Sequence, residues 1–268
     1  LGAIEQILTP IGRRLDRLHP TVDARLPDGS RLCAVVAPIA VDGPCLTIRR
    51  FSAHSLPLDQ FAPPAVAALL RELVHRRCNV LVSGATSSGK TTFLNALAGE
   101  VDATARIITL EDVAELRLPH PHVVRLETRE ATADGVGEVT LAHLLRTALR
   151  MRPDRLVVGE IRGNEAVHLL QALNTGHDGS LATVHANSAL DALERVSSLV
   201  LHEVGNWPLI AVHEHVARAI DVVAHLARGP SGSRHVIEVA EVVGGGSLAV
   251  RQLADETSVV GAPTRGRR

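Results

Sequence analysis

A glycine-rich loop between a short apolar segment and a helical segment constrains this chain more than any other feature. Residues 79–83 have the composition of a buried strand, and residues 91–98 that of a helix. The loop between them reads GATSSGKT, from Gly84 to Thr91. Successive backbone N–H groups in such a loop wrap a phosphate group at the positive end of the helix dipole. The spacing therefore predicts a phosphate site at the carboxyl end of a buried strand.

The side chains of the loop are those that a nucleoside triphosphate with Mg²⁺ requires. Lys90 is expected to bridge β- and γ-phosphate oxygens, and the Thr91 hydroxyl to ligate Mg²⁺. Lys90 is the only lysine among the 28 lysine and arginine residues, which fits a site that needs a slim point charge rather than a planar guanidinium. We predict ATP and Mg²⁺ as cofactors. The predicted nucleotide-binding residues are Gly84, Ala85, Thr86, Ser87, Ser88, Gly89, Lys90, Thr91 and Thr92.

From residue 61 onward, short apolar segments alternate with helical ones. This alternation predicts an α/β fold with a mainly parallel sheet that helices cover on both faces. Ligands bind such sheets at the carboxyl ends of the strands. Polar groups follow four predicted strands at that edge, and we expect them to form one site. They are the loop at Gly84, the pair Glu111 and Asp112, Glu160, and His185.

The acidic residues at this edge are candidates for the hydrolytic chemistry. Glu160 closes an apolar strand, where a carboxylate can orient attacking water, accept its proton, or reach Mg²⁺ through water. Glu111 and Asp112 end another strand, and paired carboxylates there suit water-mediated Mg²⁺ ligation or activation of water. The residues alone do not decide whether Glu111 or Glu160 is the base. The alternative interpretation is surface acids that favour a helix N-terminus.

Composition excludes several classes of protein. The net charge is −1 and the chain has three Phe, one Trp and no Tyr, so we expect no nucleic-acid partner. Three scattered cysteines without CxxC spacing indicate neither a disulfide framework nor a zinc site. No apolar run approaches the roughly 20 residues of a membrane-spanning helix.

The chain divides into parts with different patterns. We predict a partial α+β N-terminal domain at 1–51, with a helix over 1–17, followed by a linker at 52–60. The main domain is predicted at 61–252, and residues 253–268 are predicted to be a disordered basic tail.

A series of motifs runs in order along the chain from about residue 20 to residue 242. The motifs are VDARLPDGSRL, LTIRRF, GATSSGKTT, ITLEDVAEL, RLETRE, LRMRPDRLVVGEIRGNEA and NTGHDGSLATVHANS. Together they resemble the secretion ATPases of the type II/IV traffic-ATPase superfamily, and are most similar to the CpaF-type motors of Tad pilus assembly. The N-terminal part lacks the strands that precede the first helix in such proteins, so we expect a reduced or truncated domain there.

The resemblance implies a RecA-like P-loop NTPase domain, a flexible linker to the N-terminal domain, and a ring of six subunits with nucleotide between the two domains. It assigns Lys90 and Thr91 to the Walker A motif and Glu160 to the catalytic Walker B glutamate, in preference to Glu111. Two histidines that the residues alone would assign to a structural role match the histidine box of this family. The remaining implied residues are Glu111 and Asp112 as an acidic box, His177 and His185 as the histidine box, and Arg129, Arg125, Arg49 and Arg50 as phosphate-contacting arginines.

The resulting prediction is an ATP-hydrolysing motor that powers pilus assembly or protein secretion. Its expected partners are further copies of the same chain in a hexameric ring and an inner-membrane platform protein, and its expected place is the cytoplasmic face of that membrane. A nucleotide-dependent regulatory switch with little turnover is the alternative. A DNA translocase is disfavoured by the neutral charge and the few aromatic residues.

Overall fold

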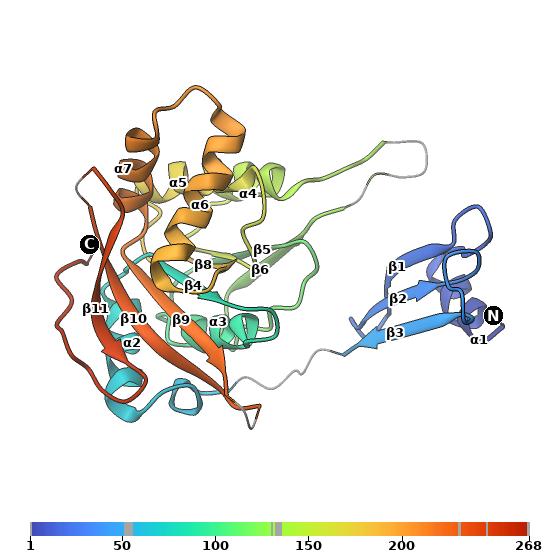
Figure 1. Cartoon of the computed structure of the whole chain (residues 1–268), viewed down its shortest axis with the longest axis horizontal. Helices are drawn as coiled ribbons and strands as arrows, with labels where there is room; N and C mark the ends of the chain where they lie inside the picture. Colours follow the sequence, from blue (N-terminus) through green and yellow to red (C-terminus); the bar gives the residue numbers. More distant parts are fainter. Residues whose placement is uncertain are drawn as a thin grey trace. The chain divides into compact units, whose positions relative to one another are not determined.

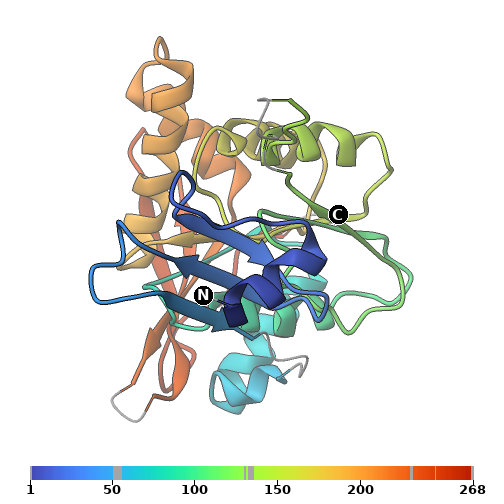
Figure 2. The same cartoon turned by 90° about the vertical axis from the view of Figure 1, so that its right-hand side faces the viewer.

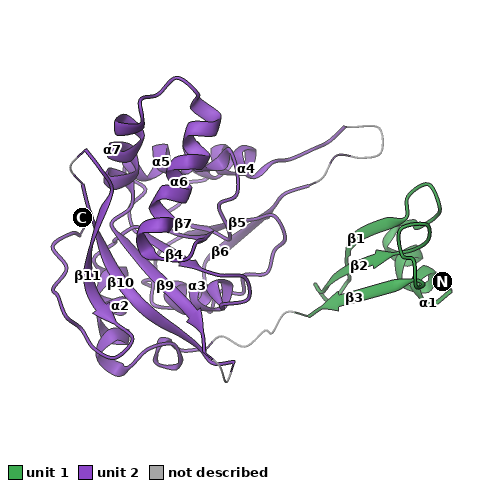
Figure 3. Ribbon diagram, viewed as in Figure 1, with its two compact units in different colours: residues 1–54 green, residues 55–268 purple. Residues whose placement is uncertain are grey.

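The computed structural model describes residues 2–50, 56–129, 131, 136–229, 232–244 and 246–266 of the 268-residue chain. The chain forms two compact units, residues 1–54 and residues 55–268 (Figure 3). The division between them falls within the segment predicted as a linker, residues 52–60, of which residues 52–55 lie outside the described residues.

The first unit is a three-stranded antiparallel sheet with a short helix against one face (Figure 2). Its elements are α1 (Gly2–Leu8), the 3-10 helix η1 (Thr9–Ile11), β1 (Thr21–Arg25), β2 (Arg31–Val35) and β3 (Cys45–Arg49). Ile4 and Leu8 of the helix pack with Leu32 of the sheet. The predicted helix over 1–17 is wrong in length, because Gly12 adopts a left-handed conformation (φ 68°) that ends the helical segment.

The second unit contains an eight-stranded, mainly parallel sheet, as predicted (Figure 1). Its strand order is β11-β10-β9-β4-β8-β7-β5-β6, parallel from β9 to β6, with β10 and β11 added antiparallel. The strands are β4 (Val80–Gly84), β5 (Ile107–Glu111), β6 (Val123–Glu127), β7 (Arg155–Val158), β8 (Leu181–His185), β9 (Val222–Arg228), β10 (Arg234–Val243) and β11 (Ala249–Asp255). Every residue of β4, β5 and β7 is buried, which explains why these strands read as continuous apolar runs.

Helices cover both faces of this sheet. On one face α4, α5, α6 and α7 share a core cluster with the strands, and on the other α2 and α3 do so. The helical elements are η2 (Leu58–Gln60), α2 (Pro64–His75), α3 (Lys90–Gly99), α4 (Leu141–Leu149), α5 (Glu165–Asn174), α6 (Ala189–Val204) and α7 (Leu209–Ala219). The side-chain oxygens of Thr140 and Ser188 cap α4 and α6 by accepting the N–H groups of His143 and Asp191. None of the described helices is long and apolar enough to cross a membrane.

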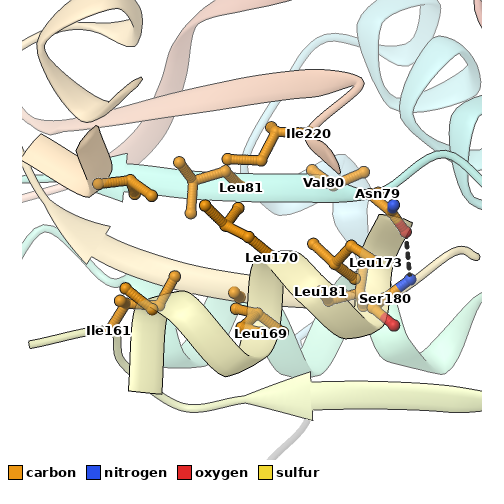
Figure 4. A pocket seen from close by; sticks show the side chains of 13 residues that line it. Asn79, Val80, Leu81, Ile161, Leu169, Leu170, Leu173, Ser180, Leu181 and Ile220 are labelled. Atoms are coloured by element: carbon orange, nitrogen blue, oxygen red, sulfur yellow. Dashed lines mark hydrogen bonds between the residues drawn. The ribbon is translucent and has the colours of Figure 1, made fainter. Parts of the chain in front are cut away.

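The layer between α5 and the strands β4 and β8 is apolar and holds a small internal pocket (Figure 4). Leu169, Leu170 and Leu173 of α5 line it. At one end of the layer the Ser180 N–H donates to Asn79 Oδ1 at 3.0 Å, and Asn79 Nδ2 donates to a backbone carbonyl at 2.7 Å. These hydrogen bonds satisfy the polar groups buried where β4 and β8 begin.

The predicted disordered tail at 253–268 is wrong for its described part. Residues 253–255 belong to β11, and the following segment returns across the domain to the buried carboxylate of Glu241. The N–H groups of Thr264 and Arg265 both donate to Glu241 Oε1 at 2.7 Å, and the Arg265 guanidinium donates to the carbonyl of Ile220 at 3.1 Å. A buried carboxylate needs such donors, and the tail supplies them.

Candidate active site

The carboxyl ends of the central parallel strands bring the polar groups together. Gly84 at the end of β4 lies opposite His185 at the end of β8 in the strand register. Glu160 follows β7, the next strand in the sheet. The phosphate loop, Glu160 and His185 therefore meet at one edge, because parallel neighbouring strands end side by side.

The conformation of the phosphate loop requires glycine at both ends. At Gly84 (φ 153°) a Cβ atom would lie 2.5 Å from Ser88 Oγ and 2.6 Å from the Leu226 carbonyl oxygen. At Gly89 (φ 95°) a Cβ atom would lie 2.6 Å from Arg234 Cδ. Ala85, Thr86 and Ser87 are exposed on the outer side of the loop, and Thr91 and Thr92 are half-buried in the first turn of α3. The loop is thus held close to β9 and β10 while its outer rim stays accessible.

Lys90 lies beneath this loop, and its ammonium group contacts three acceptors. Its Nζ donates to the carbonyls of Gly84 at 2.9 Å and Ala85 at 3.0 Å, and lies 3.2 Å from His185 Nδ1. Burial lowers the pKa of Lys90, and the nearby Glu160 carboxylate opposes that change. A phosphate group that binds Lys90 must replace one of these three acceptors, since an ammonium group has three N–H donors.

The contacts of His185 determine which of its ring nitrogens carries the proton. An ammonium group can only donate, so Nδ1 of His185 accepts from Lys90. The proton of the neutral ring is then on Nε2, which lies 3.0 Å from Glu160 Oε1. Burial, followed by the charge of Lys90, lowers the pKa of His185, which favours this neutral form. Lys90, His185 and Glu160 therefore form a contiguous polar cluster.

Arg162 extends this polar cluster. The sequence alone gave this residue no predicted role. Its Nη2 lies 2.6 Å from Glu160 Oε2, and its Nη1 lies 3.3 Å from Asp112 Oδ2. Buried Glu165 fixes the backbone beneath it by accepting the N–H groups of Arg162 and Gly163. The sequence offered one signal for this contact, since residues two apart in extended backbone share a side and Arg162 follows Glu160 at that spacing.

The Glu111 side chain points away from this polar cluster, whereas the neighbouring Asp112 contacts Arg162. The Glu111 side chain is 3% exposed, and its Oε1 accepts the N–H groups of Glu115 and Leu116, each at 2.9 Å. Its Oε2 has no hydrogen-bond partner within the described part of the chain. Burial raises the pKa of Glu111 to about 7, against the lowering effect of the two N–H donors. Glu111 packs beside Gly159, where a Cβ atom would lie 2.9 Å from its Cγ.

The structure separates the two histidines expected to form one box. His177 precedes β8 and His185 is its last residue, so a five-residue strand with a rise of about 3.3 Å per residue lies between them. His177 Nδ1 lies 3.1 Å from the carbonyl oxygen of Ala172 at the end of α5, and Ser180 Oγ donates to the His177 carbonyl. His177 therefore belongs to the opposite edge of the sheet from Lys90.

The predicted arginine contacts lie in two regions. Arg125, in β6, donates to the carbonyl of Ala114 at 3.1 Å, and Arg129 donates to the carbonyl of Gly137 at 2.5 Å. Arg129 also pairs by a β-bridge with Val139, across a loop whose residues 130 and 132–135 lie outside the described residues. Arg49 and Arg50 belong to the first unit, at the end of β3, and are exposed.

The sequence is similar to proteins of secretion and conjugation systems. Residues 4–258 match the family "Type II/IV secretion system protein". A putative conjugal transfer protein of Mycobacterium tuberculosis is 43% identical over 247 residues, which is 88% of this chain and 70% of that protein. The type IV secretion system protein PtlH of Bordetella pertussis is 35% identical over 274 residues, or 89% of this chain and 81% of that protein.

Solved structures show the same fold. The VirB11 ATPase from the Brucella suis type IV secretion system, in complex with sulphate, aligns with a TM-score of 0.58 and 30% identity over 88% of this chain and 80% of that one. The pilus retraction motor PilT with bound ADP aligns with a TM-score of 0.60 and 24% identity over 86% of this chain and 63% of that one. The second unit thus has the predicted RecA-like P-loop fold.

Proposed function

Because the chain belongs to the family of type II/IV secretion system proteins, we propose that it is an ATP-hydrolysing motor of a secretion or pilus system. The observation that carries this proposal is the polar cluster in which His185 contacts both Lys90, at 3.2 Å, and Glu160, at 3.0 Å. A phosphate loop by itself indicates only nucleotide binding, whereas a carboxylate connected to the phosphate-binding lysine adds a group that can activate water.

ATP binding follows from the loop and from the start of α3. The loop's N–H groups and the positive end of the ten-residue helix α3 would surround the β-phosphate, and Lys90 would reach its β- and γ-phosphate oxygens. The Thr91 hydroxyl would hold Mg²⁺ directly, with Glu160 and Asp112 acting through water, and the metal would neutralise phosphate charge. The solved VirB11 ATPase, which is 30% identical, is in complex with sulphate, and this supports an anion as a ligand of the present chain.

Hydrolysis would use Glu160 as the base. Its Oε1 lies 3.0 Å from Nε2 of His185, and its side chain is 18% exposed, so water can reach it. Glu111 is less suited, because its Oε1 already accepts two backbone N–H groups and its carboxyl group is buried. A water molecule that attacks the γ-phosphorus would give one proton to Glu160 while the bond to the β–γ bridging oxygen breaks.

The assembly of the motor is the part of the proposal that rests on resemblance. We infer a homo-hexameric ring at the cytoplasmic face of the inner membrane, with a membrane platform protein as partner. The relatives named for conjugal transfer and type IV secretion support a motor of this general class. Tad pilus assembly remains a prediction within that class, as do the phosphate contacts of Arg49, Arg50, Arg125 and Arg129.

The proposal is tested by steady-state ATP hydrolysis of four proteins under matched conditions. Wild type is expected to hydrolyse ATP, Lys90→Ala to lose nucleotide binding, and Glu160→Gln to bind ATP with turnover reduced at least about a hundredfold. Glu111→Gln is expected to keep most of its turnover. Turnover that survives Glu160→Gln but not Glu111→Gln would reverse the assignment of the base.

The same assay separates the alternatives. Tight ATP binding without turnover, in monomer and in ring preparations alike, would favour the regulatory switch. Strong stimulation by single-stranded DNA would favour the DNA translocase.

A further inference from the structure

Both oxygens of the Glu160 carboxylate have a protein nitrogen close by. Oε1 lies 3.0 Å from His185 Nε2, and Oε2 accepts from Arg162 Nη2 at 2.6 Å. Each carboxylate oxygen has two lone pairs, so water can still reach Glu160. A carboxylate that takes a proton loses its ion pair with a guanidinium, so Glu160 accepts the proton of the attacking water more readily once Arg162 has moved away.

The contact of Glu160 with Arg162 can open more easily than its contact with His185. His185 is held from both sides, by Lys90 at Nδ1 and by Glu160 at Nε2. The Arg162 side chain is 57% exposed, and its second contact is to Asp112, which is itself 44% exposed. Because Asp112 binds Nη1, the guanidinium can leave Glu160 and remain at this edge of the sheet. Its backbone stays fixed by Glu165, so the movement is confined to the side chain.

The chemistry of the guanidinium identifies what would draw it away. Arginine presents parallel N–H donors that match the oxygens of a carboxylate or a phosphate equally well. The γ-phosphate is the group that ATP has and ADP lacks. It would arrive next to Lys90, whose ammonium is joined to Glu160 through one histidine ring.

We propose that Arg162 is a positioning residue that holds Glu160 Oε2 until the γ-phosphate of ATP competes for its guanidinium. The proposal rests on the proposed hydrolysis of ATP. When Arg162 moves to the γ-phosphate, Oε2 accepts a hydrogen bond from the attacking water and then its proton. The water oxygen bonds to the γ-phosphorus, the β–γ bridging oxygen leaves with ADP, and inorganic phosphate forms. ADP leaves the Arg162–Glu160 pair in place.

The test is a double-mutant cycle on equilibrium binding, which needs no turnover. The affinities for ADP and for a non-hydrolysable ATP analogue are measured for the full chain as wild type, Glu160→Gln, Arg162→Met and the double variant. Glu160→Gln removes the charge that holds Arg162, so the analogue is expected to bind about twofold to fivefold more tightly, the worth of one partly exposed ion pair. In the Arg162→Met background, Glu160→Gln should leave the affinity for the analogue nearly unchanged. ADP affinity should show no such coupling.

Two controls make the result specific. Arg218→Met removes an exposed arginine of α7 that pairs with Glu214 at 3.6 Å, and it should leave both affinities unchanged. Arg162→Lys keeps the charge without the planar fork, and it should restore part of the coupling.

Two outcomes would overturn the inference. Equal effects of Glu160→Gln in the two Arg162 backgrounds would mean that Arg162 does not compete between Glu160 and the γ-phosphate. Coupling of the same size with ADP would mean that the γ-phosphate is not the group that releases the pair. A wild-type protein that binds neither nucleotide would instead refute the proposed function, so the two failures are distinguishable.

Discussion

Replacing Glu111 by glutamine removes a buried titratable carboxyl group while keeping its size. In the folded protein Glu111 is 3% exposed, and burial raises its pKa from 4.5 to about 7. Between these two pH values the folded protein binds a proton that the unfolded chain has released. Stability therefore falls as the pH rises through this window, because the native state binds more protons than the unfolded state.

The size of the effect follows from the shift. Each pKa unit corresponds to about 1.4 kcal/mol, so ionising buried Glu111 costs the folded state up to about 3 kcal/mol above pH 7. The glutamine variant has no charge to bury. We expect Glu111→Gln to be close to wild type in stability near pH 4.5, and more stable by up to about 3 kcal/mol at pH 8.

Urea denaturation of wild type and Glu111→Gln at a series of pH values measures this difference directly. Glu203→Gln, at an exposed glutamate of α6, is the matched control. A stability difference between wild type and Glu111→Gln that stays constant from pH 4.5 to pH 8 would refute the reasoning. It would mean that the buried carboxyl group does not ionise in this range, or that ionisation is accompanied by local opening.

Three further predictions follow from the same contacts. Gly84→Ala should weaken ATP binding about tenfold or more, because its Cβ would lie 2.5 Å from Ser88 Oγ and overpacking costs about 1–3 kcal/mol; unchanged affinity in a binding titration would show that the loop adjusts. Burial lowers the pKa of His185, so the ATPase rate should fall as the pH drops below 6.5, where the ring gains a proton on the nitrogen that faces Lys90. His185→Asn should lose this acidic limb of the pH–rate profile, and an unchanged limb would assign it to another group. Arg265→Met should cost about 1–3 kcal/mol in urea denaturation, since the buried carbonyl of Ile220 loses its guanidinium donor; wild-type stability would show that the tail contributes no net stabilisation.

Local rules in the sequence were enough for most of the elements. The strand before the phosphate loop and the helix after it lie within one residue of their expected bounds, because an apolar run, a glycine turn and a helical stripe are all short-range patterns. Helix caps such as Thr140 and Ser188 are short-range patterns of the same kind. The edge of the sheet that collects Glu160 and His185 followed from strand direction alone.

The direction of individual side chains did not follow from such rules. Glu111 and Glu160 are both acidic residues at the carboxyl ends of strands. Glu111 nevertheless turns into the interior and accepts the N–H groups of Glu115 and Leu116 in the next loop. Its orientation depends on Gly159, a residue of a neighbouring strand's end that leaves room for its side chain. Likewise, the two histidines share a motif, but a strand carries them to opposite edges.

From its residues alone, this chain has a phosphate loop at the end of a buried parallel strand, with Lys90 in the loop and acidic groups after the neighbouring strands. Which of those groups contact one another became known only from the three-dimensional arrangement. In the folded protein His185 lies between Lys90 and Glu160, Arg162 pairs with Glu160, and Glu111 is buried away from them. Thr264 and Arg265 of the tail donate to Glu241. The physical reason is that backbone patterns are local, whereas burial and hydrogen-bond partners come from residues far away in the chain, such as Glu241 for the tail and His185 for Lys90.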